Sequence, residues 1–160
     1  MPLFPGSAPS VQKIFFVSGA PINVTGATSS KSAAAILGTI VIPAGSCLPN
    51  SLIRVEGLFS YTNSSSSKNL GLRVGTVNIW QNGSGFAGND CALIQRNLIL
   101  RGLNSQVCIP TSNYLMGAES GVPPTFSFDF SQTQTIQFQA WSSVATDRLS
   151  LEYGFVEILY

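Results

Sequence analysis

The sequence predicts an all-β fold, and three observations lead to that prediction. Apolar and polar residues alternate over most of the chain, which is the period of a half-buried antiparallel strand. Turn residues recur about every eight to twelve positions. No segment sustains the helical period of 3.6 residues. A chain of about eight such strands favours a two-sheet sandwich, and an antiparallel jelly roll is the natural solution for that number.

The N-terminal part has a different character. Residues 1–32 are predicted to form an extended arm, and residues 33–160 the β-jelly-roll domain. Proline and glycine are frequent at the start of the arm, which favours an extended chain. Its apolar residues either cover a sheet edge of their own domain or reach onto a neighbouring subunit, and we favour the neighbour. The candidate capsid or subunit contacts are Leu3, Phe4, Phe15 and Phe16.

Residues 52–62 show the clearest strand pattern. One face carries Ile53, Val55, Gly57, Phe59 and Tyr61, which we expect to point into the core. The other face carries Leu52, Arg54, Glu56, Leu58, Ser60 and Thr62. Because this outward face has few charges and several hydroxyls, we expect it to pack against other subunits.

The other strands follow one another closely. The β-branched run at 36–42 ends in the turn Pro43-Ala44-Gly45. The serines at 64–67 are expected to remain in solvent as part of a polar loop at 63–69. Gly154 is expected to form a β-bulge in the last strand. Further strands are predicted at 70–77, 77–80, 91–101, 106–109, 126–130, 136–140 and 149–160.

The composition excludes several function classes. Only 9% of the residues are charged, against about 25% in an average soluble protein. The eight Lys and Arg residues form no cluster, so no nucleic-acid partner is expected. No apolar run is long enough for a membrane-spanning helix, and none is long enough for a secretory signal. Weak charge repulsion favours a permanent assembly, although an ordinary β-rich domain at low concentration is the alternative.

The sequence offers no catalytic or metal-binding constellation. Without histidine, the usual Ser-His-Asp and Cys-His mechanisms are excluded. Cys47, Cys91 and Cys108 lack metal-ligand spacing and are expected to be small buried residues, with a disulfide left open. The acidic residues are expected on solvated strand faces or in ion pairs, while Asp90, Glu119 and Asp147 fall in loops where a cation is conceivable. We therefore predict no enzyme activity, no metal and no cofactor; a glycan depolymerase would need paired carboxylates in one groove.

An ordered series of residues resembles a known family. The series begins with Ile42-Pro43-Ala44-Gly45, Leu52-Ile53-Arg54-Val55, Phe59-Ser60-Tyr61-Thr62-Asn63, Lys68 and Leu72-Arg73-Val74-Gly75. It continues with Arg96-Asn97, Ile99, Arg101-Gly102 and Ser105-Gln106. This series, over residues 38–106, resembles the small β-jelly-roll domains of tailed-bacteriophage virion structural proteins, of the capsid decoration, cement, head-fibre or tail-fibre type.

The resemblance implies a non-enzymatic virion protein without a cofactor. It implies a homo-oligomer, usually a trimer, that is made in the cytoplasm of the bacterial host and binds the major capsid protein or other virion subunits. The short arm favours a decoration or cement protein. The alternative is a receptor- or glycan-binding head- or tail-fibre domain, which would use the loops at one end together with Trp80 or Trp141.

Overall fold

The structure is a computed structural model of the 160-residue chain, and it describes residues 13–17, 22–25, 34–82, 87–88, 91–109 and 123–160. These residues form eleven β-strands and contain no helix, which confirms the predicted all-β class. The strands are β1 (Lys13–Val17), β2 (Ile22–Thr25), β3 (Ala35–Ile42), β4 (Leu52–Tyr61), β5 (Lys68–Val74), β6 (Val77–Gln81), β7 (Cys91–Gly102), β8 (Ser105–Ile109), β9 (Thr125–Phe126), β10 (Gln134–Ser142) and β11 (Arg148–Leu159).

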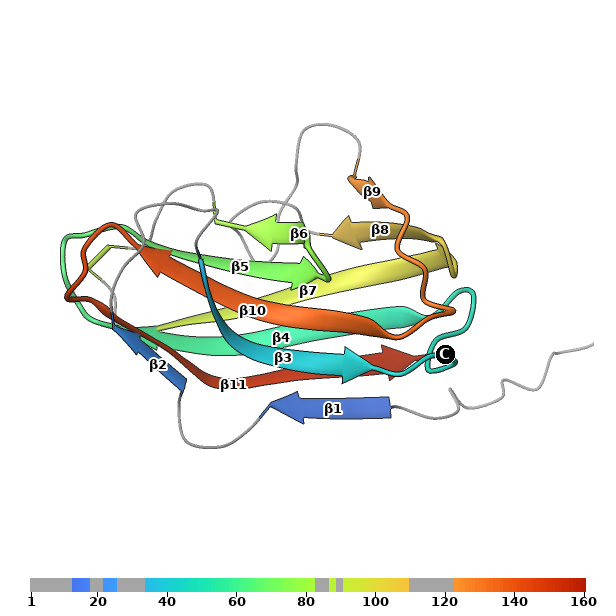
Figure 1. Cartoon of the computed structure of the whole chain (residues 1–160). Helices are drawn as coiled ribbons and strands as arrows, with labels where there is room; N and C mark the ends of the chain where they lie inside the picture. The colour runs from blue at the N-terminus through green and yellow to red at the C-terminus, as the bar shows by residue number, and fades with distance from the viewer. Residues whose placement is uncertain (1–12, 18–21, 26–33, 83–86, 89–90, 110–122) are drawn as a thin grey trace, which may run out of the picture.

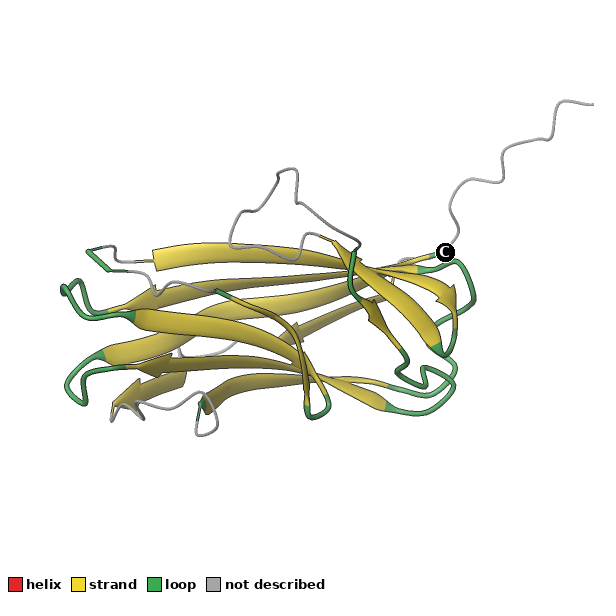
Figure 2. Ribbon diagram, turned by 90° about the horizontal axis from the view of Figure 1, so that it is seen from above, coloured by secondary structure: helices red, strands yellow, loops and turns green. Residues whose placement is uncertain are grey.

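The strands form two antiparallel sheets that pack face to face (Figures 1 and 2). The seven-stranded sheet has the order β1-β11-β4-β7-β8-β9, and β2 also pairs with β11. The four-stranded sheet has the order β3-β10-β5-β6. Seen from above, the strands run along the long axis of the molecule and the connecting loops gather at its two ends (Figure 2).

This strand order is that of a jelly roll. We count β1 and β2 as one interrupted first strand, and β8 and β9 as an insertion after β7. The first strand then pairs with the last, β11, which continues to the third, β4, and the sixth, β7. In the other sheet the second strand, β3, pairs with the seventh, β10, followed by the fourth and fifth, β5 and β6. Two Greek keys joined in this way define the jelly roll.

The first strand comes from the segment expected to be an arm. Lys13–Val17 pairs with the C-terminal half of β11, and Ile22–Thr25 pairs with its N-terminal half. Both segments therefore belong to the sheet, and a domain boundary after residue 32 leaves the first strand out. The physical reason is that β11 would otherwise be a long open edge. Of the two roles considered for the arm, these segments cover a sheet edge of their own domain, while Leu3 and Phe4 lie outside the described residues.

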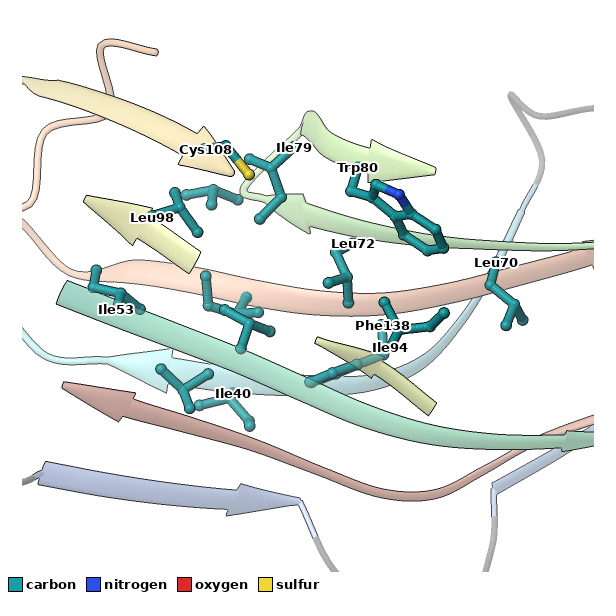
Figure 3. Packing of buried hydrophobic residues seen from close by; sticks show 14 of the residues in the cluster. Ile40, Ile53, Leu70, Leu72, Ile79, Trp80, Ile94, Leu98, Cys108 and Phe138 are labelled. Atoms are coloured by element: carbon teal, nitrogen blue, oxygen red, sulfur yellow. The ribbon is translucent and has the colours of Figure 1, made fainter. Parts of the chain in front are cut away.

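The core lies between the sheets, where large apolar side chains from both layers meet (Figure 3). Phe138 on β10 is fully buried and projects toward the seven-stranded sheet, where Gly57 on β4 lies opposite Gly154 on β11. A Cβ atom added to Gly57 would lie 2.8 Å from the Phe138 ring, and one added to Gly154 would lie 2.7 Å from it. The absence of side chains at both glycines therefore leaves the space that the Phe138 ring occupies.

The bulge in β11 lies elsewhere than predicted. Gly154 is in regular register with Gly57, and the register shifts between Leu151 and Tyr153 instead. The prediction at Gly154 was wrong because a glycine inside a strand marks either a bulge or a close approach of another group. Here it marks the close approach of Phe138.

The segment after β9 is held by a buried side chain rather than by strand pairing. The predicted strand over 126–130 is reduced to Thr125–Phe126. Beyond it, Gln106 accepts a hydrogen bond from the Phe128 backbone N–H at 2.9 Å and donates to the Phe128 carbonyl at 3.0 Å. Gln106 is fully buried, and it also donates to the carbonyl of Leu103 at 2.9 Å. One amide side chain thus connects the β7–β8 hairpin to this segment.

Candidate interaction surface

The outward side of the seven-stranded sheet is unusually apolar. The strand alternation expected for residues 52–62 is confirmed, with odd positions of β4 buried and even positions partly exposed. A solvated antiparallel sheet normally shows polar residues on this side. Here seven of the twelve central outward positions on β4, β7 and β11 are aliphatic or aromatic. We call these positions the interaction face: Leu52, Arg54, Glu56, Leu58, Leu93, Gln95, Asn97, Ile99, Tyr153, Phe155, Glu157 and Leu159.

The register of the strands arranges the interaction face in four rows. Across β4 and β7, one outer row joins Leu52 to Ile99, and the other joins Leu58 to Leu93. The two central rows are polar and join Arg54 to Asn97 and Glu56 to Gln95. On β11 the rows continue in the same order through Leu159, Glu157, Phe155 and Tyr153.

The charges of the two central rows are already paired within the chain. Arg54 Nη1 donates to Glu157 Oε2 at 2.7 Å, and the Glu157 side chain is only 8% exposed. The Tyr153 hydroxyl donates to Glu56 Oε1 at 2.8 Å. Burial, followed by this hydrogen bond and the charge of Glu56, raises the pKa of Tyr153, so its hydroxyl remains a donor at neutral pH. The Arg54–Glu157 pair presents little net field to an approaching surface, while Glu56 keeps its charge beside a neutral hydroxyl.

The apolar rows are open to solvent. Leu93 and Ile99 are 43% and 40% exposed, and Ile14 on the neighbouring β1 is 47% exposed. Exposed apolar side chains gathered on one sheet face are candidates for a contact with another molecule. Of the predicted contact residues on β1, Phe16 is opposite Phe155, an outward position, whereas Phe15 is opposite Val156, a buried position.

A second polar group lies at one end of the sandwich and is fully enclosed. Lys68 and Asp147 are 0% and 3% exposed, and Lys68 Nζ lies 3.7 Å from Asp147 Oδ2. Asp147 accepts hydrogen bonds from the hydroxyls of Ser64 at 3.0 Å and Ser142 at 2.7 Å, and also from that of Ser66. Burial alone would raise the pKa of Asp147, but these three hydroxyls and the charge of Lys68 together lower it.

This enclosed group corrects two expectations. The serines at 64–67 do not simply remain in solvent, because Ser64 and Ser66 bind Asp147 across 81 or more residues of sequence. Asp147 is not available to a cation, because both of its oxygens are engaged. The cluster therefore joins the β4–β5 loop to the β10–β11 turn. Asp90 and Glu119 lie outside the described residues.

The same cluster also contains a serine beside a lysine, which is a known catalytic pairing. The direction of the hydrogen bonds argues against catalysis here. Lys68 Nζ donates to Ser64 Oγ at 2.6 Å, and Ser64 Oγ in turn donates to Asp147. Lys68 thus acts as a donor toward the serine rather than as its base, and it has no exposed surface from which a substrate would reach it.

The remaining candidate groups are accounted for within the described part of the chain. The carboxylates of Glu56, Glu152 and Glu157 are each bound by a side chain of the neighbouring strand, and no group of three acidic or cysteine residues there is arranged to hold a metal ion. No described helix is long and apolar enough to cross a membrane. Cys47 and Cys108 are buried as expected, whereas Cys91 is exposed, and all three are free thiols.

The two tryptophans are part of the packed structure. Trp80 is 3% exposed, and the Arg96 guanidinium lies 4.3 Å from the centre of its ring. Trp141 is 8% exposed. Neither ring offers a free face on which a sugar would stack, so the expectation that they are packing residues is confirmed.

Comparison with known proteins identifies no family for this chain. No protein-family model matches the chain, and no curated protein sequence matches it significantly. Similar solved structures include the insecticidal delta-endotoxin Cry8Ea1 from Bacillus thuringiensis, with 14% identity and a TM-score of 0.44 over 88% of this chain. Dimeric latent PorU from Porphyromonas gingivalis has 9% identity and a TM-score of 0.47 over 96% of the chain. The VP2 subviral particle of infectious bursal disease virus has 10% identity and a TM-score of 0.43 over 99% of the chain.

These likenesses extend over only part of the other proteins. The chain spans 19% of the endotoxin, 14% of PorU and 36% of VP2. With TM-scores below 0.5 and low identities, they carry no argument about function. The class that the structure itself defines is an antiparallel jelly-roll β-sandwich with an apolar outward sheet face.

Proposed function

We propose that this chain is a non-enzymatic structural subunit of a bacteriophage particle, which decorates or cements the capsid as an oligomer. The observation that carries this proposal is the interaction face, where two exposed apolar rows flank charges that are already paired. The resemblance of residues 38–106 to phage virion jelly-roll domains supplies the kind of particle. The fold is compatible with that resemblance.

The mechanism would be burial of apolar and amide-rich surface between subunits. An interface needs to bury only about 800 Å² on each partner to be specific. A trimer, which the resemblance implies, would attach through three such contacts, and their combined avidity would far exceed one contact. The partners would be other copies of the chain and the major capsid protein, and the site of action would be the virion after synthesis in the host cytoplasm.

Deleting the start of the N-terminal arm tests whether the arm helps to attach the protein to the particle. Deleting residues 1–10 removes Leu3 and Phe4 but leaves β1 and every other described strand intact. We expect the shortened protein to keep its fold and to occupy phage particles more weakly, as measured by quantitative gel analysis of purified particles. Undiminished occupancy would show that Leu3 and Phe4 are not anchors. Absence of the full-length protein from particles would refute the proposed function itself.

The alternative function, a receptor- or glycan-binding fibre domain, makes a different prediction. It loses Trp80 and Trp141 as contacts, because both are buried. The surface still available for such binding is the end of the sandwich where the Lys68–Asp147 cluster joins the β4–β5 loop to the β10–β11 turn. Binding of the isolated protein to host cells, with labelled copies located at a fibre tip rather than on the capsid, would favour this alternative.

A further inference from the structure

The interaction face has a pattern that is complementary to itself. Read along β4, the outward residues are Leu52, Arg54, Glu56 and Leu58, so a cation and a carboxylate lie between two leucines. The facing positions of β7 are Ile99, Asn97, Gln95 and Leu93, so two amides lie between two aliphatic residues. The order of rows is therefore apolar, cation with amide, carboxylate with amide, and apolar.

One kind of two-fold contact satisfies this pattern on β4 and β7. Consider an axis that lies in the face, crosses the strands, and passes between the Arg54 and Glu56 rows. A half-turn about it places Leu52 over Leu58 of the partner subunit and Arg54 over Glu56 of the partner subunit. An axis parallel to the strands and running along β4 would instead place Arg54 over the partner's Arg54. An isologous interface must be self-complementary in this way.

We propose that the interaction face binds the same face of a second copy of this chain about this two-fold axis. The two sheets would stack about 10 Å apart, as sheets do within a β-sandwich. The apolar rows would lose their contact with water, which is the main favourable contribution. This inference rests on the proposed function in one respect: it specifies one subunit contact of the assembly proposed there. If the chain forms trimers, the same contact would join neighbouring trimers.

The central charges favour this arrangement over other occupants. Burying a charge without a partner is costly, whereas a hydrogen-bonded pair is tolerated. Arg54 is already bound to Glu157 and Glu56 to Tyr153, so the two-fold contact extends these pairs into a network. Asn97 would face Gln95 of the partner subunit, which matches amide to amide. A lipid surface or a neutral glycan would leave the pattern of charges unmatched.

Solution mass tests the contact directly. We expect sedimentation velocity of the purified chain to show reversible self-association in the micromolar range. Leu93→Glu and Ile99→Glu lie at exposed positions, so they should leave the fold intact and weaken association by at least about tenfold. Val77→Glu, at 46% exposure on β6 of the other sheet, is the matched control and should associate like the unmodified chain. Equal effects of Leu93→Glu and Val77→Glu, or a monomeric unmodified chain, would overturn the proposal.

A charge exchange tests the axis itself. Arg54→Glu leaves two carboxylates at the central positions of β4, and Glu56→Arg leaves two cations there, so each variant should fail to associate with itself. Mixed together, they restore opposite charges across the axis and should form a heterodimer at least about tenfold more readily than either homodimer. No gain on mixing would overturn the axis. Should Arg54→Glu fail to fold beside Glu157, the apolar variants decide the outcome.

The same variants separate this inference from the proposed function. If Leu93→Glu leaves the solution mass unchanged while the unmodified chain binds particles, the two-fold contact is refuted and the proposed function stands. If Leu93→Glu abolishes association while the unmodified chain does not bind particles, the contact stands and the proposed function fails.

Discussion

At the scale of single residues, Gly57 and Gly154 determine how Phe138 enters the seven-stranded sheet. The two glycines lie side by side on β4 and β11, and their missing side chains leave room for the ring. Their strand positions are evident from the sequence, but their partner lies on β10 of the other sheet. Alternation alone therefore predicts the strands and leaves the reason for each glycine open.

Substituting Gly154 with alanine should destabilise the protein. The new Cβ would lie 2.7 Å from the Phe138 ring, so the ring or a strand has to move. We expect a loss of about 1–3 kcal/mol in the free energy of unfolding, the usual cost of overpacking, measured by urea denaturation. Gly102→Ala is the control because no atom lies within 4 Å of its added Cβ. Equal stability of the two variants would refute the role assigned to Gly154.

The Lys68–Asp147 cluster predicts a dependence of stability on acid. The pKa of Asp147 is lower in the folded protein than its ordinary value of 3.8, because hydroxyl hydrogen bonds and Lys68 outweigh the effect of burial. A lowered carboxyl pKa stabilises the fold above the unfolded value, and this stabilisation is lost as the pH falls through the folded value. The protein should therefore lose stability below about pH 4.

The variant Asp147→Asn isolates this contribution. It leaves Lys68 buried without its carboxylate partner, which should cost about 3 kcal/mol at neutral pH. The fall in melting temperature on acidification should also become shallower than in the unmodified chain. Asp129→Asn, in a turn where the carboxylate accepts hydrogen bonds from Ser131 and lies away from any buried lysine, is the matched control and should keep the original pH profile. Parallel pH profiles for Asp147→Asn and the unmodified chain would contradict the assignment.

At the scale of elements, the strands that alternate cleanly were predicted well, and those defined by distant partners were not. β4 and β7 follow their alternation throughout, and the expected inward residues Leu72 on β5 and Phe138 on β10 are buried. The first strand was assigned to an extended arm because its two short segments are separated by loop-like sequence and owe their place in the sheet to pairing with β11, more than 120 residues later. Lys68 and Arg96 were missed as core residues for the same reason, since no local pattern shows that a distant group encloses them.

Two truncations test the role of this first strand. Removing residues 1–12 leaves β1 and β2 in place, so the protein should melt like the full chain in a calorimeter. Removing residues 1–25 takes away both segments and exposes the edge of β11. We expect this second protein to be much less stable and prone to aggregate, because an open edge strand pairs with other chains. If both truncated proteins melt at the same temperature, the first strand is not part of the stable fold.

At the scale of the whole molecule, the residues that carry the phage resemblance are mostly those that build the fold. Ile53, Phe59 and Leu72 lie in the core, Lys68 belongs to the enclosed ion pair, and Gln106 connects two segments. This explains why the resemblance predicted the jelly roll correctly. It also explains why function has to be sought on the surface, where Leu93 and Ile99 are exposed and lie outside the strand from which the outward face was first inferred.

The low charge of the molecule predicts how its assemblies respond to salt. Lysine and arginine number eight, aspartate and glutamate seven, and Arg54 and Glu157 of the interaction face are paired within the chain. At 1 M salt the Debye length falls to about 3 Å, so contacts held by exposed charges weaken, whereas apolar burial does not. The association of this chain should therefore change less than about threefold between low salt and 1 M sodium chloride, as measured by sedimentation velocity. Dissociation at high salt would show that charge pairs, rather than the Leu52–Ile99 and Leu58–Leu93 rows, provide the main attraction between copies.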